Sequence, residues 1–222
     1  MTYSVKEIFY TLQGEGIRAG RPSVFCRFSG CNLWSGREED RDQAICNFCD
    51  TDFVGTDGTQ GGKFPTASQL ASAVASMWPK GKSNRYVVLT GGEPLLQVDQ
   101  ALIEALHKQD FEIAVETNGT VLAPHGIDWI CVSPKAGAEW IQRTGNELKL
   151  IYPQALLMPS MIKTEVFDHY LLQPMDPVDK TLGGHGAIQN AQRTNTERAI
   201  DYCQQNPEWR LSVQTHKILE IR

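Results

Sequence analysis

Short apolar runs that end in polar residues recur along the chain and predict β-strands. Tyr86–Leu89 is continuously apolar, which is typical of a parallel strand buried on both faces. Val24–Phe28 is rich in β-branched and aromatic residues, and Ser4–Tyr10 alternates well enough to be a strand. Further strands are predicted at Phe111–Val115, Trp129–Val132, Glu147–Tyr152, Tyr170–Gln173 and Arg210–Gln214.

Helical patterns lie between several of these runs. Thr66 and the three residues after it form a capping-box start for a helix that ends near Trp78. Other helices are expected over Val98–Gln109 and from Thr194 or Thr196 to Gln205. The polar stretch Met175–Asn195 is expected to be a long loop, in which His185 is an exposed histidine rather than a metal ligand.

Strands that alternate with helices predict parallel β/α units, with a site where polar residues follow the carboxyl ends of the strands. A complete eight-unit barrel needs about 250 residues. The chain has 222 residues and six or so core strands. The sequence therefore predicts an α/β fold with an incomplete β/α barrel of parallel strands, as a single domain over residues 1–222.

Composition narrows the class of protein. A net charge of -5 and no basic run argue against a nucleic-acid partner. Neither a secretion signal nor an apolar stretch of about 18 residues is found, so we expect no membrane association and a cytoplasmic location. Six cysteines could pair as disulfides, but the tight Cys46/Cys49 pair favours metal ligation in a reducing compartment.

Three cysteines in one loop are the main candidates for chemistry: Cys31, Cys46 and Cys49. A structural zinc site takes four protein ligands, and an electron-transfer iron–sulfur cluster usually takes four cysteines. Three thiolates around a four-iron cube leave one iron open to a small molecule. The loop therefore favours a reactive 4Fe-4S site over a closed metal knot.

The nearest fourth thiol belongs to Cys26, within a predicted strand. Its neighbours on the same strand face, Val24 and Phe28, are apolar, so Cys26 is expected in the core rather than at the metal. The alternative of a knot closed by four cysteines stays open. Cys131 and Cys203 are expected to be buried thiols.

Polar residues at other strand ends are weaker signals. Asp50–Asp52 could provide oxygen ligands for Mg²⁺ or could be a solvated turn. The turn Gly91-Gly92-Glu93 allows a backbone to approach a ligand closely, with the glutamate compensating an ammonium charge, but glycines mark turns everywhere. Arg27 is either a site residue or a surface arginine.

The cysteine loop resembles that of the radical S-adenosylmethionine (SAM) superfamily. In that superfamily an aromatic residue precedes the last cysteine, as Phe48 does here, and a Gly-Gly-Glu-Pro turn follows a strand, as at Gly91–Pro94. The departure is the gap of fourteen residues between Cys31 and Cys46, where the usual gap is three. Those residues must form an excursion that returns the chain to the cluster.

Motifs along nearly the whole chain narrow the resemblance to the 7-carboxy-7-deazaguanine synthase family, in which the spacing of the cluster loop varies. These motifs are Thr11–Gly16, Phe25–Phe28, Asp50-Thr51, Glu116–Gly119, Val132–Lys135, Gln173–Asp176 and Gln214–Lys217. The resemblance implies conversion of 6-carboxy-5,6,7,8-tetrahydropterin to 7-carboxy-7-deazaguanine with loss of ammonia, in the pathway to 7-deazapurines and queuosine.

The resemblance also implies roles for individual residues. Cys31, Cys46 and Cys49 would hold the 4Fe-4S cluster, and Thr51 would ligate Mg²⁺. SAM would contact Phe48, Cys49, Asp50, Gly92, Ser133, Pro134, Lys135, Gln173, Pro174, Met175 and Asp176. The pterin would contact Leu12, Gln13, Gly14, Arg27, Thr90, His216 and the carboxylate of Arg222. Glu116 and Lys135 are candidates for proton handling.

In the implied mechanism, the reduced cluster cleaves SAM, and the resulting 5′-deoxyadenosyl radical takes hydrogen from the pterin before the ring contracts. An electron donor such as a flavodoxin or ferredoxin and a homodimer are further implications. Two alternatives are kept. A radical-SAM activase of glycyl-radical enzymes would share the cysteine loop and the Gly-Gly-Glu turn, and a non-catalytic zinc-binding module would share only the thiols.

Overall fold

The computed structural model describes residues 2–79, 81, 83–162, 166–176 and 185–222. The strands are β1 Tyr3–Leu12, β2 Pro22–Phe28, β3 Gly62–Phe64, β4 Tyr86–Gly91, β5 Glu112–Thr117, β6 Trp129–Val132, β7 Gly145–Tyr152, β8 Phe167–Pro174 and β9 Trp209–Leu211. The helices are α1 Ala67–Met77, α2 Gln100–His107, α3 His185–Gln205 and α4 Thr215–Ile218, with 3-10 turns at Glu38–Gln43, Pro94–Leu96 and Pro159–Met161.

The strands form one sheet in the order β3-β1-β2-β4-β5-β6-β7-β8-β9. Each pair from β2 to β9 is parallel, whereas β1 pairs antiparallel with β2 and β3. The described strands do not pair across the two edges, so the sheet curls without closing. The incomplete parallel barrel predicted from the sequence is confirmed, with two antiparallel strands added at one edge.

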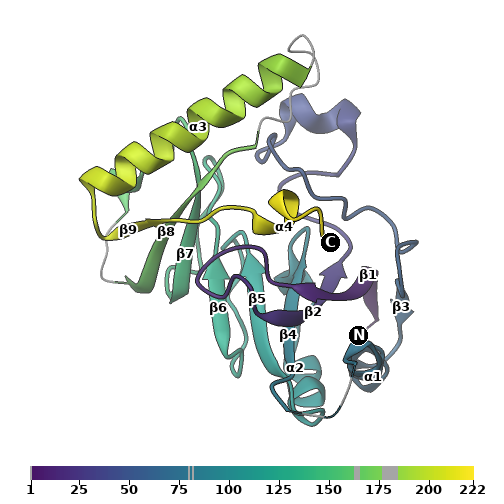
Figure 1. Ribbon diagram of the computed structural model, residues 1–222. Coiled ribbons are helices and arrows are strands. Elements are labelled where there is room, and N and C mark those ends of the chain that lie inside the picture. Colours follow the sequence, from purple (N-terminus) through teal and green to yellow (C-terminus); the bar gives the residue numbers. More distant parts are fainter. Residues whose placement is uncertain (1, 80, 82, 163–165, 177–184) are drawn as a thin grey trace.

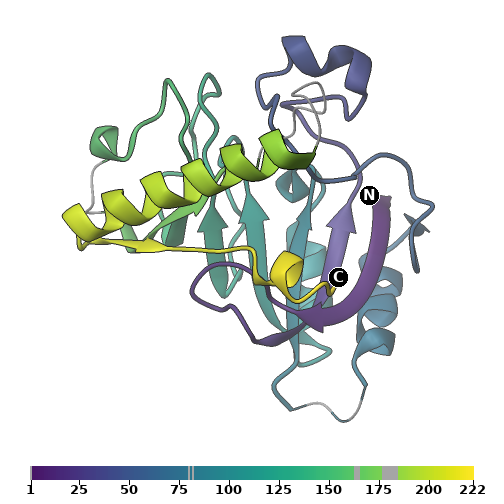
Figure 2. The same ribbon diagram turned by 45° about the horizontal axis from the view of Figure 1, so that its top comes forward.

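Helices cover the outer side of the sheet, and two connecting segments cross its inner side. The core under α1 and α2 contains Leu70, Leu102 and Val87, all fully buried. The loop between β1 and β2 and the segment after β9 both pass in front of the central strands (Figures 1 and 2). The inner side is therefore closed by segments from near the two ends of the chain.

The first two predicted helices are confirmed within two residues at each end. Helix α1 begins after Thr66, whose side-chain oxygen accepts a hydrogen bond from the Gln69 N–H, as an N-cap should. Asp99 caps α2 in the same way through the Leu102 N–H. The described residues contain no helix long and apolar enough to cross a membrane.

The expected loop Met175–Asn195 is wrong over its second half. Helix α3 begins at His185, about ten residues earlier than predicted, and runs to Gln205. Its first turns are polar and carry little apolar periodicity, so no helical pattern is visible in those residues. His185 therefore lies in a helix and not in the predicted loop. Its side chain and residues 177–184 lie outside the described part of the structure.

Candidate active site

The three loop cysteines line one cavity together with Phe48. Cys31 and Cys49 are half-buried and Cys46 is buried. The Leu33 N–H donates to Cys31 Sγ at 3.4 Å, and the Asn118 amide lies 4.0 Å from the same sulfur. Such N–H groups stabilise thiolate sulfurs and tune the potential of iron–sulfur clusters.

Cys26 is separated from this group. It is fully buried on β2 beside Val24 and Phe28, and burial raises the pKa of its thiol. The prediction that Cys26 belongs to the core is confirmed.

Arg41 closes the fourteen-residue excursion before Cys46. Its guanidinium lies 4.1 Å from the ring centre of Trp34 and 2.7 Å from a carboxylate oxygen of Glu38. It also donates to the carbonyl oxygens of Asn47 and Cys49, at 2.8 and 2.9 Å. One arginine therefore ties the excursion to the backbone on both sides of Phe48, which the sequence did not reveal.

The glycine turn after β4 packs against the cysteine loop. A Cβ on Gly92 would lie 2.1 Å from the Gly30 carbonyl oxygen and 2.8 Å from Cys31 Cβ. Only glycine fits this close approach. The Glu93 side chain is fully buried and accepts from the Thr117 hydroxyl and the Asn118 N–H, so it braces the next strand end instead of facing the cavity.

The predicted SAM residues gather around this first cavity. Its lining includes Phe48, Cys49, Asp50, Gly92, Ser133, Lys135, Gln173, Pro174, Met175 and Asp176. Pro134 is buried behind the lining, where its carbonyl oxygen accepts from the Gln154 amide at 3.3 Å. Lys135 Nζ donates to the Ser133 hydroxyl at 2.7 Å. The described cavity lining therefore collects residues from the ends of β4, β6 and β8 with the cysteine loop.

The predicted pterin residues line a second cavity of about 290 Å³. They are Leu12, Gln13, Gly14, Arg27, Thr90, His216 and Arg222. The two cavities adjoin, because six residues line both: Glu15, Asp50, Thr51, Thr90, Glu116 and Gln214. Thr51, the predicted Mg²⁺ ligand, thus stands in the shared wall.

Two guanidinium groups lie at one wall of the second cavity. Arg27 Nε lies 2.9 Å from one carboxylate oxygen of Glu7, and the Arg222 guanidinium lies 2.7 Å from the other. Both guanidinium groups are therefore held at this wall of the cavity by the same carboxylate. The Arg222 backbone oxygen accepts from the Thr11 hydroxyl at 2.6 Å, which fixes this residue at the cavity.

The N-terminal loop and the C-terminal segment hold each other at the second cavity. The Gly14 carbonyl oxygen accepts from both the N–H and the hydroxyl of Thr215 at 2.9 Å. A Cβ on Gly14 would lie 2.2 Å from His216 Nδ1, so this position needs glycine. Burial lowers the pKa of His216, which favours the neutral imidazole.

Three charged residues outside the predicted set complete the site: Glu15, Lys149 and Lys217. Lys217 Nζ lies 2.6 Å from Asp50 and 2.5 Å from Asp176, which joins the C-terminal segment to the first cavity. Lys149 Nζ lies 2.5 Å from Glu15 and 2.8 Å from Glu116 in the wall between the cavities. The alternating polar positions of β7 were the available signal for Lys149.

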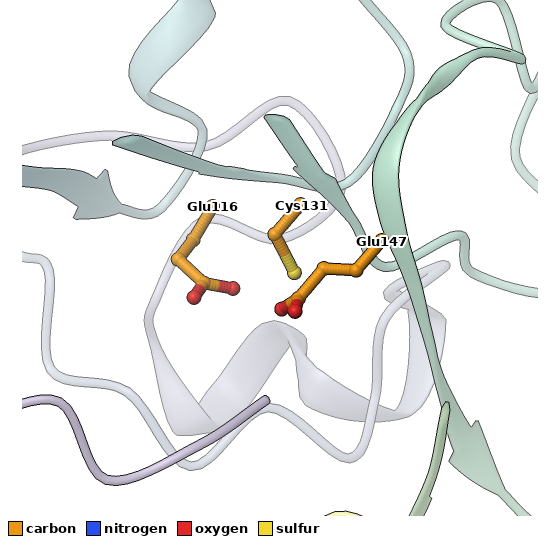
Figure 3. Close-up of side chains that lie close together, drawn as sticks. All are labelled: Glu116, Cys131 and Glu147. Carbon is orange, nitrogen blue, oxygen red and sulfur yellow. The ribbon is translucent and has the colours of Figure 1, made fainter. Parts of the chain in front are cut away.

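Glu116 has a neighbourhood suited to proton transfer. It lines both cavities, and its carboxylate accepts from the Gln13 amide at 3.2 Å. Burial raises the pKa of Glu116, and the carboxylates of Glu147 and Glu15 add to this effect while Lys149 opposes it. Figure 3 shows the Glu116 and Glu147 side chains converging on Cys131, which is buried as expected; Cys203 is half-buried.

Comparison with known proteins agrees with this geometry. The family profile described as Radical SAM superfamily matches residues 43–146. A 7-carboxy-7-deazaguanine synthase from Bradyrhizobium diazoefficiens is 62% identical over 222 residues, which covers 100% of both chains. Another from Burkholderia multivorans is 57% identical over 221 residues, again covering 100% of both chains. A crystal structure of QueE from Escherichia coli matches with a TM-score of 0.67 at 26% identity, covering 97% of this chain and 95% of that chain.

Proposed function

Because the chain belongs to the 7-carboxy-7-deazaguanine synthase family of the radical SAM superfamily, we propose the following roles for its residues in that family's reaction. The reaction converts 6-carboxy-5,6,7,8-tetrahydropterin to 7-carboxy-7-deazaguanine and ammonia. The observation that carries the proposal is the pair of adjoining cavities, one with three thiols and a glycine turn, the other with two arginines.

In the first cavity, Cys31, Cys46 and Cys49 would hold a 4Fe-4S cluster, which would supply the one-electron reduction that cleaves SAM. The close packing of Gly92 against Cys31 supports this fit, because it brings a bare backbone turn beside the cysteine loop. Phe48 and the residues after β6 and β8 orient SAM and exclude water.

In the second cavity, Arg27 pairs with the carboxylate of the pterin, which a guanidinium can bind through two hydrogen bonds. Thr51, which lines both cavities, would ligate a Mg²⁺ ion, and the ion would orient the same carboxylate. Leu12–Gly14, Thr90, His216 and the carboxylate of Arg222 hold the rest of the ring system. Glu116 and Lys135 handle protons.

The proposal includes a cytoplasmic location, because the cluster thiolates require a reducing compartment and all six cysteines are free. It also includes an external one-electron donor such as a flavodoxin or ferredoxin, because SAM cleavage requires a reduced cluster. A homodimer follows from the family assignment alone.

Anaerobic reconstitution with iron and sulfide tests the proposal. The protein is incubated with SAM, dithionite and 6-carboxy-tetrahydropterin while product absorbance is followed, with and without Mg²⁺. We expect a brown protein that forms the deazapurine, and faster turnover with Mg²⁺. A colourless protein with one zinc per chain and intact SAM would support a zinc-binding module, and SAM cleavage without pterin turnover would support an activase.

A further inference from the structure

Three ionisable side chains form a row inside the barrel, on neighbouring strands. Glu116 on β5 pairs in register with Cys131 on β6, and Cys131 pairs with Glu147 on β7. Residues paired in this way across a sheet point to the same face. Their ligand atoms all lie within 4.8 Å of one another. Figure 3 shows the three side chains gathered in one place.

Carboxyl groups outnumber cationic groups around this row of side chains. The titratable groups near the Glu116 carboxyl are Glu15 from the β1–β2 loop, Tyr86 on β4, Cys131 on β6, and Glu147 and Lys149 on β7. Lys149 is the one cation among them, and its ammonium is shared between Glu15 and Glu116. Three carboxyl groups therefore face one ammonium in a part of the barrel where each side chain is mostly buried.

Glu15 and Glu147, the two carboxyl groups beside Glu116, differ in their partners. Glu15 has Lys149 at 2.5 Å and the Gln214 amide at 2.8 Å, and although burial opposes ionisation these partners lower its pKa to about 2. Glu147 is 2% exposed and accepts from the Ile17 N–H at 2.9 Å. Two like charges this close do not both persist in a buried site, so a proton belongs between Glu116 and Glu147.

We propose that Glu116 and Glu147 share one proton in the resting enzyme, and that Glu116 donates it to the amine that leaves as ammonia. Glu147 is a positioning residue, because it does not line the described cavities and acts through Glu116. This inference rests on the proposed function and adds to it the direction of proton transfer and the residue that sets that direction.

The proton transfers balance in the elimination step. The carbon–nitrogen bond breaks, and its electron pair leaves with the amine nitrogen, which takes the proton of Glu116 and departs as ammonia. The ring carbon adjacent to the one that carried the amine then loses a proton to the Glu116 carboxylate, and the electrons of that carbon–hydrogen bond form the double bond between the two carbons. The carboxyl pair ends with the one proton with which it began.

Infrared difference spectroscopy tests the shared proton without turnover. We expect the wild-type protein near pH 7 to show the carbonyl stretch of a protonated carboxyl group, with its isotope shift in D₂O. The band should vanish in Glu116→Gln and also in Glu147→Gln, because removal of the neighbouring charge lets Glu116 ionise beside Lys149. The matched control is Glu112→Gln on the same strand, since Glu112 pairs with Arg18 and Arg21 and should carry no proton.

Kinetics provide the second readout. In the wild type, kcat should be constant at low pH and fall as Glu116 loses its proton. In Glu147→Gln, the amide oxygen can still accept from the Ile17 N–H. The decrease in kcat should begin at least one pH unit lower than in the wild type, so that kcat is about tenfold lower at pH values above the transition, with KM unchanged. Glu116→Gln should accumulate a ring-contracted species with the mass of the substrate, because ammonia has not left.

The outcomes separate the two proposals. A wild-type protein that makes product but shows no protonated carboxyl band refutes the shared proton and leaves the proposed function intact. A band that survives in Glu147→Gln, or a divalent metal bound in equimolar amount at Glu116, Cys131 and Glu147, also refutes it. If Glu147→Gln does not fold, the wild-type band and its loss in Glu116→Gln decide the question.

Discussion

Replacing Lys149 by methionine isolates the contribution of the buried charge network to stability. The Lys149 side chain is 5% exposed, and its ammonium contacts carboxylates of Glu15 and Glu116 that are each 18% exposed. Removing one partner of a buried ion pair costs roughly 3–5 kcal/mol, because the other charge is left unpaired. Methionine has nearly the same length, so the packing contribution to this loss is small.

The lowered pKa of Glu15 is consistent with a loss of this size. It is lowered from 4.5 to about 2 in the folded protein, despite the opposing effect of burial, and Lys149 is the main favourable cause. A shift of this size corresponds to about 3 kcal/mol of stability, present above pH 4.5 and lost as the pH falls toward 2. We therefore expect Lys149→Met to lower the free energy of unfolding by about 3 kcal/mol at pH 7.5.

The pH dependence of that loss has a defined sign. Without Lys149, burial raises the pKa of Glu15, and its ionisation then destabilises the fold above its unfolded pKa. Acidification from pH 7.5 to 5 protonates Glu15 in the folded variant, while the wild type keeps the contribution of the Glu15–Lys149 pair at pH 5. The difference in unfolding free energy between the two proteins should therefore narrow over this range.

Urea denaturation of the reduced apoprotein at pH 7.5 and pH 5 measures this difference. Lys217→Met is the matched control, since Lys217 also contacts two carboxylates but its side chain is 36% exposed. Exposed pairs contribute about 0–1 kcal/mol each, so the control should lose little and change little with pH. A Lys149→Met loss no larger than the control, or equal at both pH values, would contradict the reasoning.

Four shorter predictions follow from the site and the core. Cys31→Ala should abolish cluster iron and SAM cleavage, whereas Cys26→Ala should keep full iron content and lose about 1 kcal/mol of stability; equal iron loss would place Cys26 at the cluster. Gly92→Ala should abolish SAM binding by equilibrium dialysis, because its Cβ would lie 2.1 Å from a carbonyl oxygen. Arg27→Gln should raise the pterin KM about 10–100-fold and leave uncoupled SAM cleavage unchanged, as loss of a charge-assisted pair predicts. Thr66→Ala should cost about 1 kcal/mol in urea titrations through the lost N-cap, with kcat unaffected.

The strand pattern was predictable because buried parallel strands leave a local signature. Tyr86–Leu89 and its counterparts needed only their own residues to be recognised, and most observed strands begin and end within a few positions of the predicted ones. The strand predicted over Arg210–Gln214 is the exception, because β9 ends at Leu211. The start of α3 was not predictable, because its polar first turns carry no periodic apolar face. Its C-terminal part packs on β8 and β9, where Ala199 is fully buried, and the helical signal is confined to that part.

Some residues of the candidate site were likewise predictable from the sequence and others were not. The cysteine loop and the Gly91-Gly92 turn are contiguous motifs, so each could be recognised from the sequence alone. The fold places both at the same cavity. Lys149 and Lys217 take their meaning from partners 134 and 167 residues away, Glu15 and Asp50. The residues next to a lysine in the sequence do not indicate which distant carboxylate it will pair with.

The two cavities differ in which part of the chain builds them, and this division bears on specificity. The superfamily profile covers residues 43–146, which include Cys46, Cys49 and the glycine turn beside the first cavity. Of the residues that line only the second cavity, all except Asp52 lie outside that segment, in β1, β2 and the C-terminal stretch. On the proposed function, the segment matched by the superfamily profile supplies two of the three cluster cysteines and the glycine turn, whereas most of the proposed substrate contacts lie outside it. Lys217 joins the two sets, because its ion pairs tie the C-terminal stretch at the second cavity to Asp50 and Asp176 at the first.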